Sequence, residues 1–155
     1  MTPKSLLRSG LVASPLCEFT EDSFENFIVS RSDPKDVKRL IFCSGKIFYD
    51  LLKVFEERNR RDVDIIRIEQ LYPFDGEKFL QILRRYAGAG EFVWAQEETK
   101  NRGAWAFMRE KVDELAGIRL IYCGRKASPS PAGGSMKQHL REQRDIVTEA
   151  FSVKE

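Results

Sequence analysis

Adjacent cations and hydroxyl groups gather in one loop near the end of the chain, at Arg125, Lys126, Ser128 and Ser135. A helix is predicted to begin after Ser135, and a helix N-terminus beside a guanidinium group favours phosphate or carboxylate. This loop therefore fits an anion or nucleotide site. The alternative is a glycine-rich turn that Ser135 caps, with solvated cations. We favour that alternative slightly, because the loop matches neither GxGxxG nor the P-loop pattern.

The carboxylates Glu97 and Glu98 directly follow a predicted strand. Consecutive residues at a strand end point in different directions, so the two do not form a simple acid and base pair. Beside Asn101 and Arg102, a carboxylate is more often an acceptor that orders a loop, or a contact to another subunit, than a proton donor.

His139, the only histidine, is predicted to lie about one turn inside the last helix. No Cys or Asp spacing around it resembles a metal site, and no GxSxG or Cys-His signature supplies a nucleophile. A structural imidazole is therefore the favoured interpretation. Aromatic side chains could form a binding surface, but their spacing favours burial in a core or an interface. They are Phe92, Trp94, Trp105 and Phe107.

Composition narrows the class of protein. A chain of 155 residues, 42% hydrophobic and 32% charged, fits one ordinary globular domain. Lys and Arg number 26 against 24 Asp and Glu, a formal net charge of +2, which predicts neither nucleic acid nor a membrane surface as partner. No apolar stretch approaches the roughly 20 residues of a membrane helix, so we expect a soluble chain. Three cysteines without CxxC spacing favour a reducing compartment.

Strand candidates rich in β-branched and aromatic residues alternate with helical patterns. They cover residues 39–43, 63–68, 91–95 and 118–123. This alternation predicts a three-layer α/β/α domain with a mainly parallel sheet over residues 37–155. Residues 1–36 are expected to form a linker or arm, in which residues 24–29 could add an edge strand. Ligands of such sheets gather beyond the carboxyl ends of the strands, so the loops after the strands are the places to search.

Helix limits follow from capping residues. Asp75 is expected to cap the second helix of the domain. The third is expected to start near Gly103 and to stop at Gly117, and Ser135 with Gln138 three positions later fits a capping box for the fourth.

Several loop motifs resemble, in order, the C-terminal domain of the decarboxylating subunit of the 2-oxoglutarate dehydrogenase complex, a thiamine-diphosphate enzyme of the transketolase superfamily. The resemblance covers nearly the whole chain. The motifs are residues 1–8 (MTPKSLLR), 43–46 (CSGK), 67–74 (RIEQLYPF), 96–98 (QEE), 103–105 (GAW), 124–125 (GR) and 130–132 (SPA), with Asn101 and His139.

The resemblance implies a transketolase C-terminal-like fold whose mixed sheet has one antiparallel strand. It also implies a parent reaction, the oxidative decarboxylation of 2-oxoglutarate and transfer of the succinyl unit to the lipoyl group of an acyltransferase, in the citric acid cycle. In that family, thiamine diphosphate and magnesium are held by upstream domains through a GDG…NN motif, which this sequence lacks. We therefore expect a fragment or equivalent of the last domain, without catalytic, cofactor-binding or metal-binding residues of its own.

The expected partners are the upstream thiamine-binding domains, a second copy of the subunit and the acyltransferase. The expected location is the cytoplasm of a bacterium or the mitochondrial matrix of a eukaryote. An effector-binding module for acetyl-CoA or a nucleotide, with Arg125, Lys126, Ser128 and Ser135 as candidate contacts, is the alternative, as is a related 2-oxoacid dehydrogenase. The resemblance assigns interdomain or dimer contacts to Glu69, Tyr72, Glu97, Glu98, Asn101 and Trp105.

Overall fold

The computed structural model describes residues 4–7, 9–20, 24–30, 34–130 and 134–152. Its centre is a five-stranded sheet in the order β1-β3-β2-β4-β5. Strands β2, β3, β4 and β5 are parallel, and β1 pairs antiparallel with β3 at one edge. The mainly parallel mixed sheet is therefore confirmed, with its antiparallel strand inside the predicted segment 24–29. The strands are β1 (Phe27–Val29), β2 (Arg39–Cys43), β3 (Val63–Ile68), β4 (Glu91–Thr99) and β5 (Ile121–Arg125).

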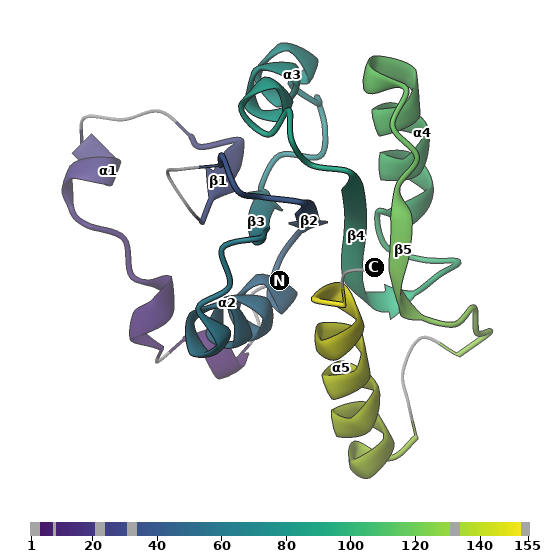
Figure 1. Ribbon diagram of the computed structural model, residues 1–155. Coiled ribbons are helices and arrows are strands. Elements are labelled where there is room, and N and C mark those ends of the chain that lie inside the picture. Colours follow the sequence, from purple (N-terminus) through teal and green to yellow (C-terminus); the bar gives the residue numbers. More distant parts are fainter. Residues whose placement is uncertain (1–3, 8, 21–23, 31–33, 131–133, 153–155) are drawn as a thin grey trace.

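Helices cover both faces of the sheet, which gives the predicted three layers (Figure 1). The long helices are α2 (Ile47–Arg58), α3 (Gly76–Arg85), α4 (Trp105–Ala116) and α5 (Met136–Ala150). Side chains of α2 and α5 share one buried cluster with Ile41, Val63 and Val93, whereas those of α3 and α4 share the other with Phe42 and Trp94. The central strands are apolar on both faces because each face packs against a pair of helices.

The N-terminal segment forms short turns, η1 (Lys4–Leu6), η2 (Gly10–Val12) and α1 (Cys17–Thr20). Figure 1 shows α1 standing apart from the sheet. Large apolar side chains of this segment are exposed, among them Leu7 at 69%, Leu11 at 60% and Leu16 at 79%. This exposure agrees with an arm rather than a packed layer, and the boundary near residue 36 stays a prediction.

Local chemistry explains where the helices begin and end. The Oδ1 atom of Asp75 accepts a hydrogen bond from the amide of Lys78 at 2.9 Å, so the predicted cap of α3 is present. Gly117, with φ of 64°, ends α4 in the left-handed region that glycine adopts without strain. Ser135 occupies the cap position of α5, but its side chain makes no capping hydrogen bond. The capping box was wrong, because Gln138 donates to Glu142 instead of reaching back.

Two strand limits also differ from the prediction. Strand β4 continues to Thr99 instead of ending at residue 95, so Glu97 and Glu98 lie within a strand. Strand β5 begins at Ile121, because the apolar residues before it, such as Leu120 at 5% exposure, fill the core without joining the sheet. A run of apolar residues indicates that a segment is buried, but a buried segment need not pair with a neighbouring strand.

Candidate functional site

A polar network joins α2, β4 and α5 at the carboxyl edge of the sheet. The ammonium of Lys46 lies 3.1 Å from Oε1 of Glu97 and 3.4 Å from Oδ2 of Asp50. The amide of Gln143 donates to the same two oxygen atoms, at 2.9 Å each. Burial acts to lower the pKa of Lys46, but the hydrogen bonds and charges of Glu97 and Asp50 raise it overall. Lys46 therefore stays protonated and serves as a tether, not as a base.

An irregularity in β4 aims Glu97 at this network. Ala95 pairs with Cys123 and Thr99 pairs with Arg125, so three residues of β4 span a stretch where β5 has one. Such a bulge re-aims side chains at a sheet edge. Glu97 turns toward α2 and α5, whereas Glu98 is exposed. The two carboxylates therefore have different surroundings, in agreement with the different directions expected for them.

Gln96 is a buried polar hub, 3% exposed, to which the sequence assigned no role beyond its place in the motif 96–98. Its Oε1 atom accepts from Nε1 of Trp94 at 2.8 Å and from the amide of Trp105 at 3.0 Å, and its Nε2 atom donates to the carbonyl of Arg102 at 2.8 Å. Gly103 has φ of 66°, and a Cβ atom there would lie 2.9 Å from Gln96 Oε1. The sequence feature that could have pointed to this role is a single amide side chain directly after a run of apolar strand residues.

The loops after β4 and β5 are tied to each other. Asn101 donates to the carbonyl of Ser128 at 3.0 Å and accepts from its amide at 3.1 Å. Arg102 donates to the carbonyl of Pro129 at 3.1 Å. Asn101 therefore orders the loop that carries the predicted cations.

A hollow of about 590 Å3 lies between that loop and α5, and we call it the β5–α5 hollow. Its lining brings together three of the predicted anion contacts, Arg125, Lys126 and Ser128, but not Ser135. Three carboxylates of α5 line it as well. The lining residues are Thr99, Gly124, Arg125, Lys126, Ala127, Ser128, Ser130, Gly134, Gln138, Glu142, Asp145, Ile146 and Glu149.

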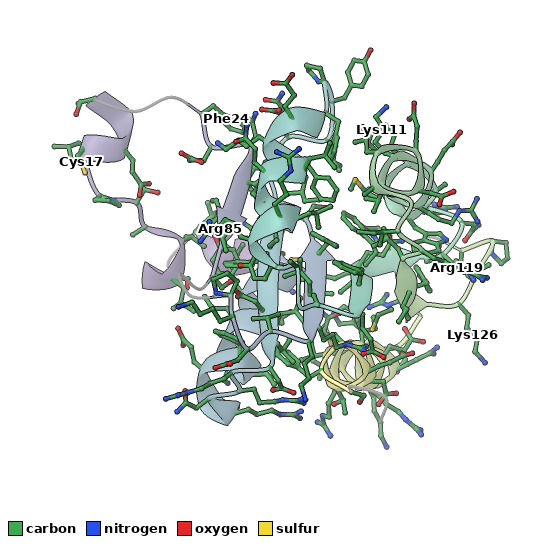
Figure 2. All side chains as sticks on the ribbon, turned by 45° about the horizontal axis from the view of Figure 1, so that its top comes forward. Cys17, Phe24, Arg85, Lys111, Arg119 and Lys126 are labelled. Atoms are coloured by element: carbon green, nitrogen blue, oxygen red, sulfur yellow. The ribbon has the colours of Figure 1, made fainter. Side chains whose placement is uncertain are left out.

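The two predicted cations differ in their availability. The guanidinium of Arg125 contacts Nδ1 of His139 at 2.7 Å and lies 3.3 Å from the carboxylate of Glu142. His139 therefore has the structural role that was favoured, as a partner of Arg125. Lys126 is exposed, and Figure 2 shows its side chain pointing away from the molecule. Lys126 is therefore open to an incoming anion, whereas Arg125 already pairs with Glu142.

The floor of the hollow contains an unsatisfied hydroxyl. Thr99 is 7% exposed, and its Oγ1 atom has no hydrogen-bond partner among the described residues. Next to it, Gly124 leaves room for Tyr122, because a Cβ atom at this position would lie 2.6 Å from the Tyr122 hydroxyl. That hydroxyl donates to the carbonyl of Arg125 at 2.6 Å, and burial raises the pKa of Tyr122 to about 12. Tyr122 thus remains a neutral donor that fixes the hollow's wall.

The remaining predicted contact residues do not share one environment. Glu69 pairs with Arg67 at 2.9 Å, and Tyr72 is 85% exposed in the loop after β3. Trp105 is 7% exposed and packs against the ring of Tyr122 at 4.9 Å, so it is a core residue and not a surface contact. Its place at the start of α4 turns it toward the sheet, which corrects the expectation of an interface role.

Neither a metal cluster nor a membrane helix appears in the part of the chain that the structure describes. No group of three or more His, Cys, Asp and Glu side chains there could hold a metal ion. None of the described helices is both long and apolar enough to span a bilayer.

Comparison with known proteins decides the family. The family described as "2-oxoglutarate dehydrogenase C-terminal" matches residues 13–151. The chain belongs to this family. It is 44% identical over 98% of its length to the 2-oxoglutarate dehydrogenase E1 component of Haemophilus influenzae, covering 17% of that protein. It is 39% identical to the mitochondrial 2-oxoglutarate dehydrogenase of Caenorhabditis elegans, covering 98% of this chain and 16% of the relative.

A solved structure supports the fold alone. The chain matches a "Split gene transketolase, inactive beta4 tetramer" with a TM-score of 0.59 and 20% sequence identity, over 82% of this chain and 42% of the other. The transketolase-like fold implied by the loop motifs is therefore confirmed. The chain spans only about a sixth of the relatives it matches, 16 to 17% of their length.

Proposed function

We propose that this 2-oxoglutarate dehydrogenase C-terminal domain is a non-catalytic assembly domain that completes an E1 subunit. The observation that carries the proposal is the polar network at the carboxyl edge, where Lys46 and Gln143 both donate to the carboxylates of Asp50 and Glu97. Only Gln143 Oε1 lacks a partner among the described residues of this network. A catalytic carboxylate or lysine must be free to form a hydrogen bond with its substrate. Groups tied to each other instead hold three elements in a fixed arrangement, as an assembly surface requires.

The parent reaction follows from the relatives. The complete subunit would decarboxylate 2-oxoglutarate oxidatively and transfer the succinyl unit to the lipoyl group of an acyltransferase. Upstream domains would hold thiamine diphosphate and magnesium, and the subunit would pair with a second copy. The bacterial and mitochondrial relatives support a location in the bacterial cytoplasm or the mitochondrial matrix.

Exposed loop residues supply the contact surface in this proposal. Tyr72 is 85% exposed, and a large aromatic side chain in water is a typical anchor of an interface. Glu69, Glu98 and Asn101 are exposed as well. Together with Glu97 in the network, they lie in or beside the loops that follow β3 and β4, and we assign the interdomain and dimer contacts to these residues.

A chimaera tests the proposal. The isolated chain with 2-oxoglutarate, thiamine diphosphate and Mg2+ is expected to release no CO2, and turnover by the chain alone would contradict it. In a second step, the matching segment of the Haemophilus influenzae E1 component is replaced by this chain. The chimaera is expected to be active, and Tyr72→Ala to weaken its subunit association roughly tenfold, in the range of an aromatic interface anchor. Gln81→Ala, at an exposed position on α3, is the matched control.

A ligand-binding module is the second candidate, favoured by the β5–α5 hollow and its unsatisfied Thr99 hydroxyl. Its volume lies within the range of small-molecule sites. If acetyl-CoA or AMP is the effector, either should raise the Tm, and Arg125→Ala should reduce that rise. Lys126→Ala separates a direct contact to the anion from a loss of folding, because Lys126 is exposed. A flat titration at millimolar ligand would count against the module.

A further inference from the structure

The β5–α5 hollow has more anionic than cationic groups. Its lining holds the carboxylates Glu142, Asp145 and Glu149 against the cations Arg125 and Lys126. Glu142 already accepts from Gln138 at 2.7 Å and pairs with Arg125. Among the described residues, Asp145 and Glu149 form no ion pair. Two carboxylates without an ion pair therefore face the hollow, opposed by the one exposed ammonium of Lys126, and that of Glu149 also meets the thiol of Cys123.

This balance disfavours a polyanion. An anion that enters between Lys126 and α5 approaches the carboxylates of Asp145 and Glu149, and it competes with Glu142 for the guanidinium of Arg125. Like charges within a few Å oppose each other, and the low dielectric of a hollow strengthens that opposition. A cation entering the same space meets the carboxylates of α5 without displacing a protein partner.

Thr99 adds an independent sign of a ligand. Thr99 is 7% exposed and lines the hollow, and its Oγ1 atom has no hydrogen-bond partner in the described part of the chain. A buried hydroxyl without a partner is destabilising, and natural structures leave few of them unsatisfied. A protonated primary amine has three donors, enough to reach this oxygen and a carboxylate at once. Ile146, Gly124 and Ala127 supply apolar surface for a short carbon chain.

We propose that the β5–α5 hollow binds a small molecule that carries a protonated primary amine. The amine lies between Thr99 and the carboxylates of Asp145 and Glu149. This inference rests on the second candidate function, a ligand-binding module, and names the class of its ligand. It is independent of the assembly role.

The experiment compares matched probes on the full 155-residue chain. Backbone amide NMR shifts are followed at Gly124, Ala127 and Ile146 during titration with 1,4-diaminobutane, with the uncharged 1,4-butanediol and with AMP. We expect the diamine to shift these resonances, the diol to leave them unchanged, and the diamine affinity to fall as salt is raised from 50 to 500 mM, because salt screens the attraction.

Variants assign the contacts. Asp145→Asn and Glu149→Gln should each weaken diamine binding roughly 2- to 5-fold, as expected for partly exposed charge pairs. Thr99→Val should weaken it by roughly 2- to 10-fold, whereas Thr99→Ser retains the hydroxyl and should bind nearly normally. Asp113→Asn, at an exposed position on α4, is the charge-matched control.

The outcomes separate the proposals. A diamine that shifts none of the three resonances, or an affinity that Asp145→Asn and Glu149→Gln leave unchanged, overturns the inference. If AMP shifts them and the diamine does not, the ligand-binding module stands and the amine ligand is wrong. If no probe shifts them, both are wrong, while the assembly role is judged separately by the chimaera.

Discussion

Replacing Gln96 by Leu should be among the most destabilising single changes near the carboxyl edge. The substitution keeps the side-chain size but removes the acceptor of Trp94 Nε1 and of the Trp105 amide, and both donors are buried. A buried donor left without a partner costs about 1–3 kcal/mol. Two such donors, with some relaxation, give a loss of about 3 kcal/mol. For a chain of this size, that corresponds to a fall in Tm of roughly 6–12 °C.

Urea unfolding followed by tryptophan fluorescence measures this loss, with Gln81→Leu at an exposed position on α3 as the control for the same chemical change. Amide hydrogen exchange adds a local readout, because Gln96 also holds the loop through the carbonyl of Arg102. The amide of Trp105 should exchange faster in Gln96→Leu. A loss below about 1 kcal/mol, or an equal loss in Gln81→Leu, would refute the hub role of Gln96.

Further predictions concern groups elsewhere in the chain. Arg39→Met should cost about 3 kcal/mol in urea unfolding, because it strips a 3% exposed guanidinium from Glu91 and from the carbonyls of Glu149 and Ala150; a change below 1 kcal/mol would contradict it. A thiol reagent should label one cysteine of the native chain and three in denaturant, because Cys17 is exposed (Figure 2), whereas burial raises the pKa of Cys43 and raises that of Cys123 to about 12. The hydrogen bond from Arg60 lowers the pKa of Asp62 in the folded chain. The carboxylate therefore stabilises the fold at pH values above its pKa in the unfolded chain, and this stabilisation is lost as the pH falls through the lowered pKa of the folded chain. Wild type and Asp62→Asn should therefore converge in stability in acid, and a pH-independent difference would argue against the pair.

The sequence predicted the layers because their physical signal is local. Runs such as residues 39–43 and 63–68 are apolar on both faces, and they became β2 and β3 with the same limits. Asp75 begins α3 and Gly117 ends α4 as expected, since a cap and a left-handed residue act within a few positions of themselves. The predicted limits of β4 and β5 were wrong, because a bulge and an unpaired apolar segment depend on which strand lies next to them in the sheet.

The site was predicted less completely because its contacts are remote in sequence. Gln143 meets Asp50 across 93 positions and Glu97 across 46, and no spacing rule links such residues. The sequence suggested Arg125 as an anion contact and His139 as a structural imidazole, but nothing in their spacing showed that the two side chains contact each other. The acidic side of the β5–α5 hollow was missed for a similar reason. Its carboxylates lie on a helix whose exposed face is ordinarily polar, and only the fold turns that face toward Thr99.

Helix α5 links the two polar sites of the carboxyl edge. Its C-terminal end is held by Arg39, which donates to the carbonyl of Ala150 at 2.7 Å, and by Arg60, which donates to that of Phe151 at 2.7 Å. Cationic donors at a helix C-terminus satisfy carbonyls that have no partner within the helix. Nearer its N-terminal end, Gln143 joins the Lys46 network and Glu142 pairs with Arg125. These four contacts all involve α5 or its C-terminal cap. The position of α5 that brings Gln143 to the Lys46 network therefore also sets the distance between the α5 carboxylates and Thr99.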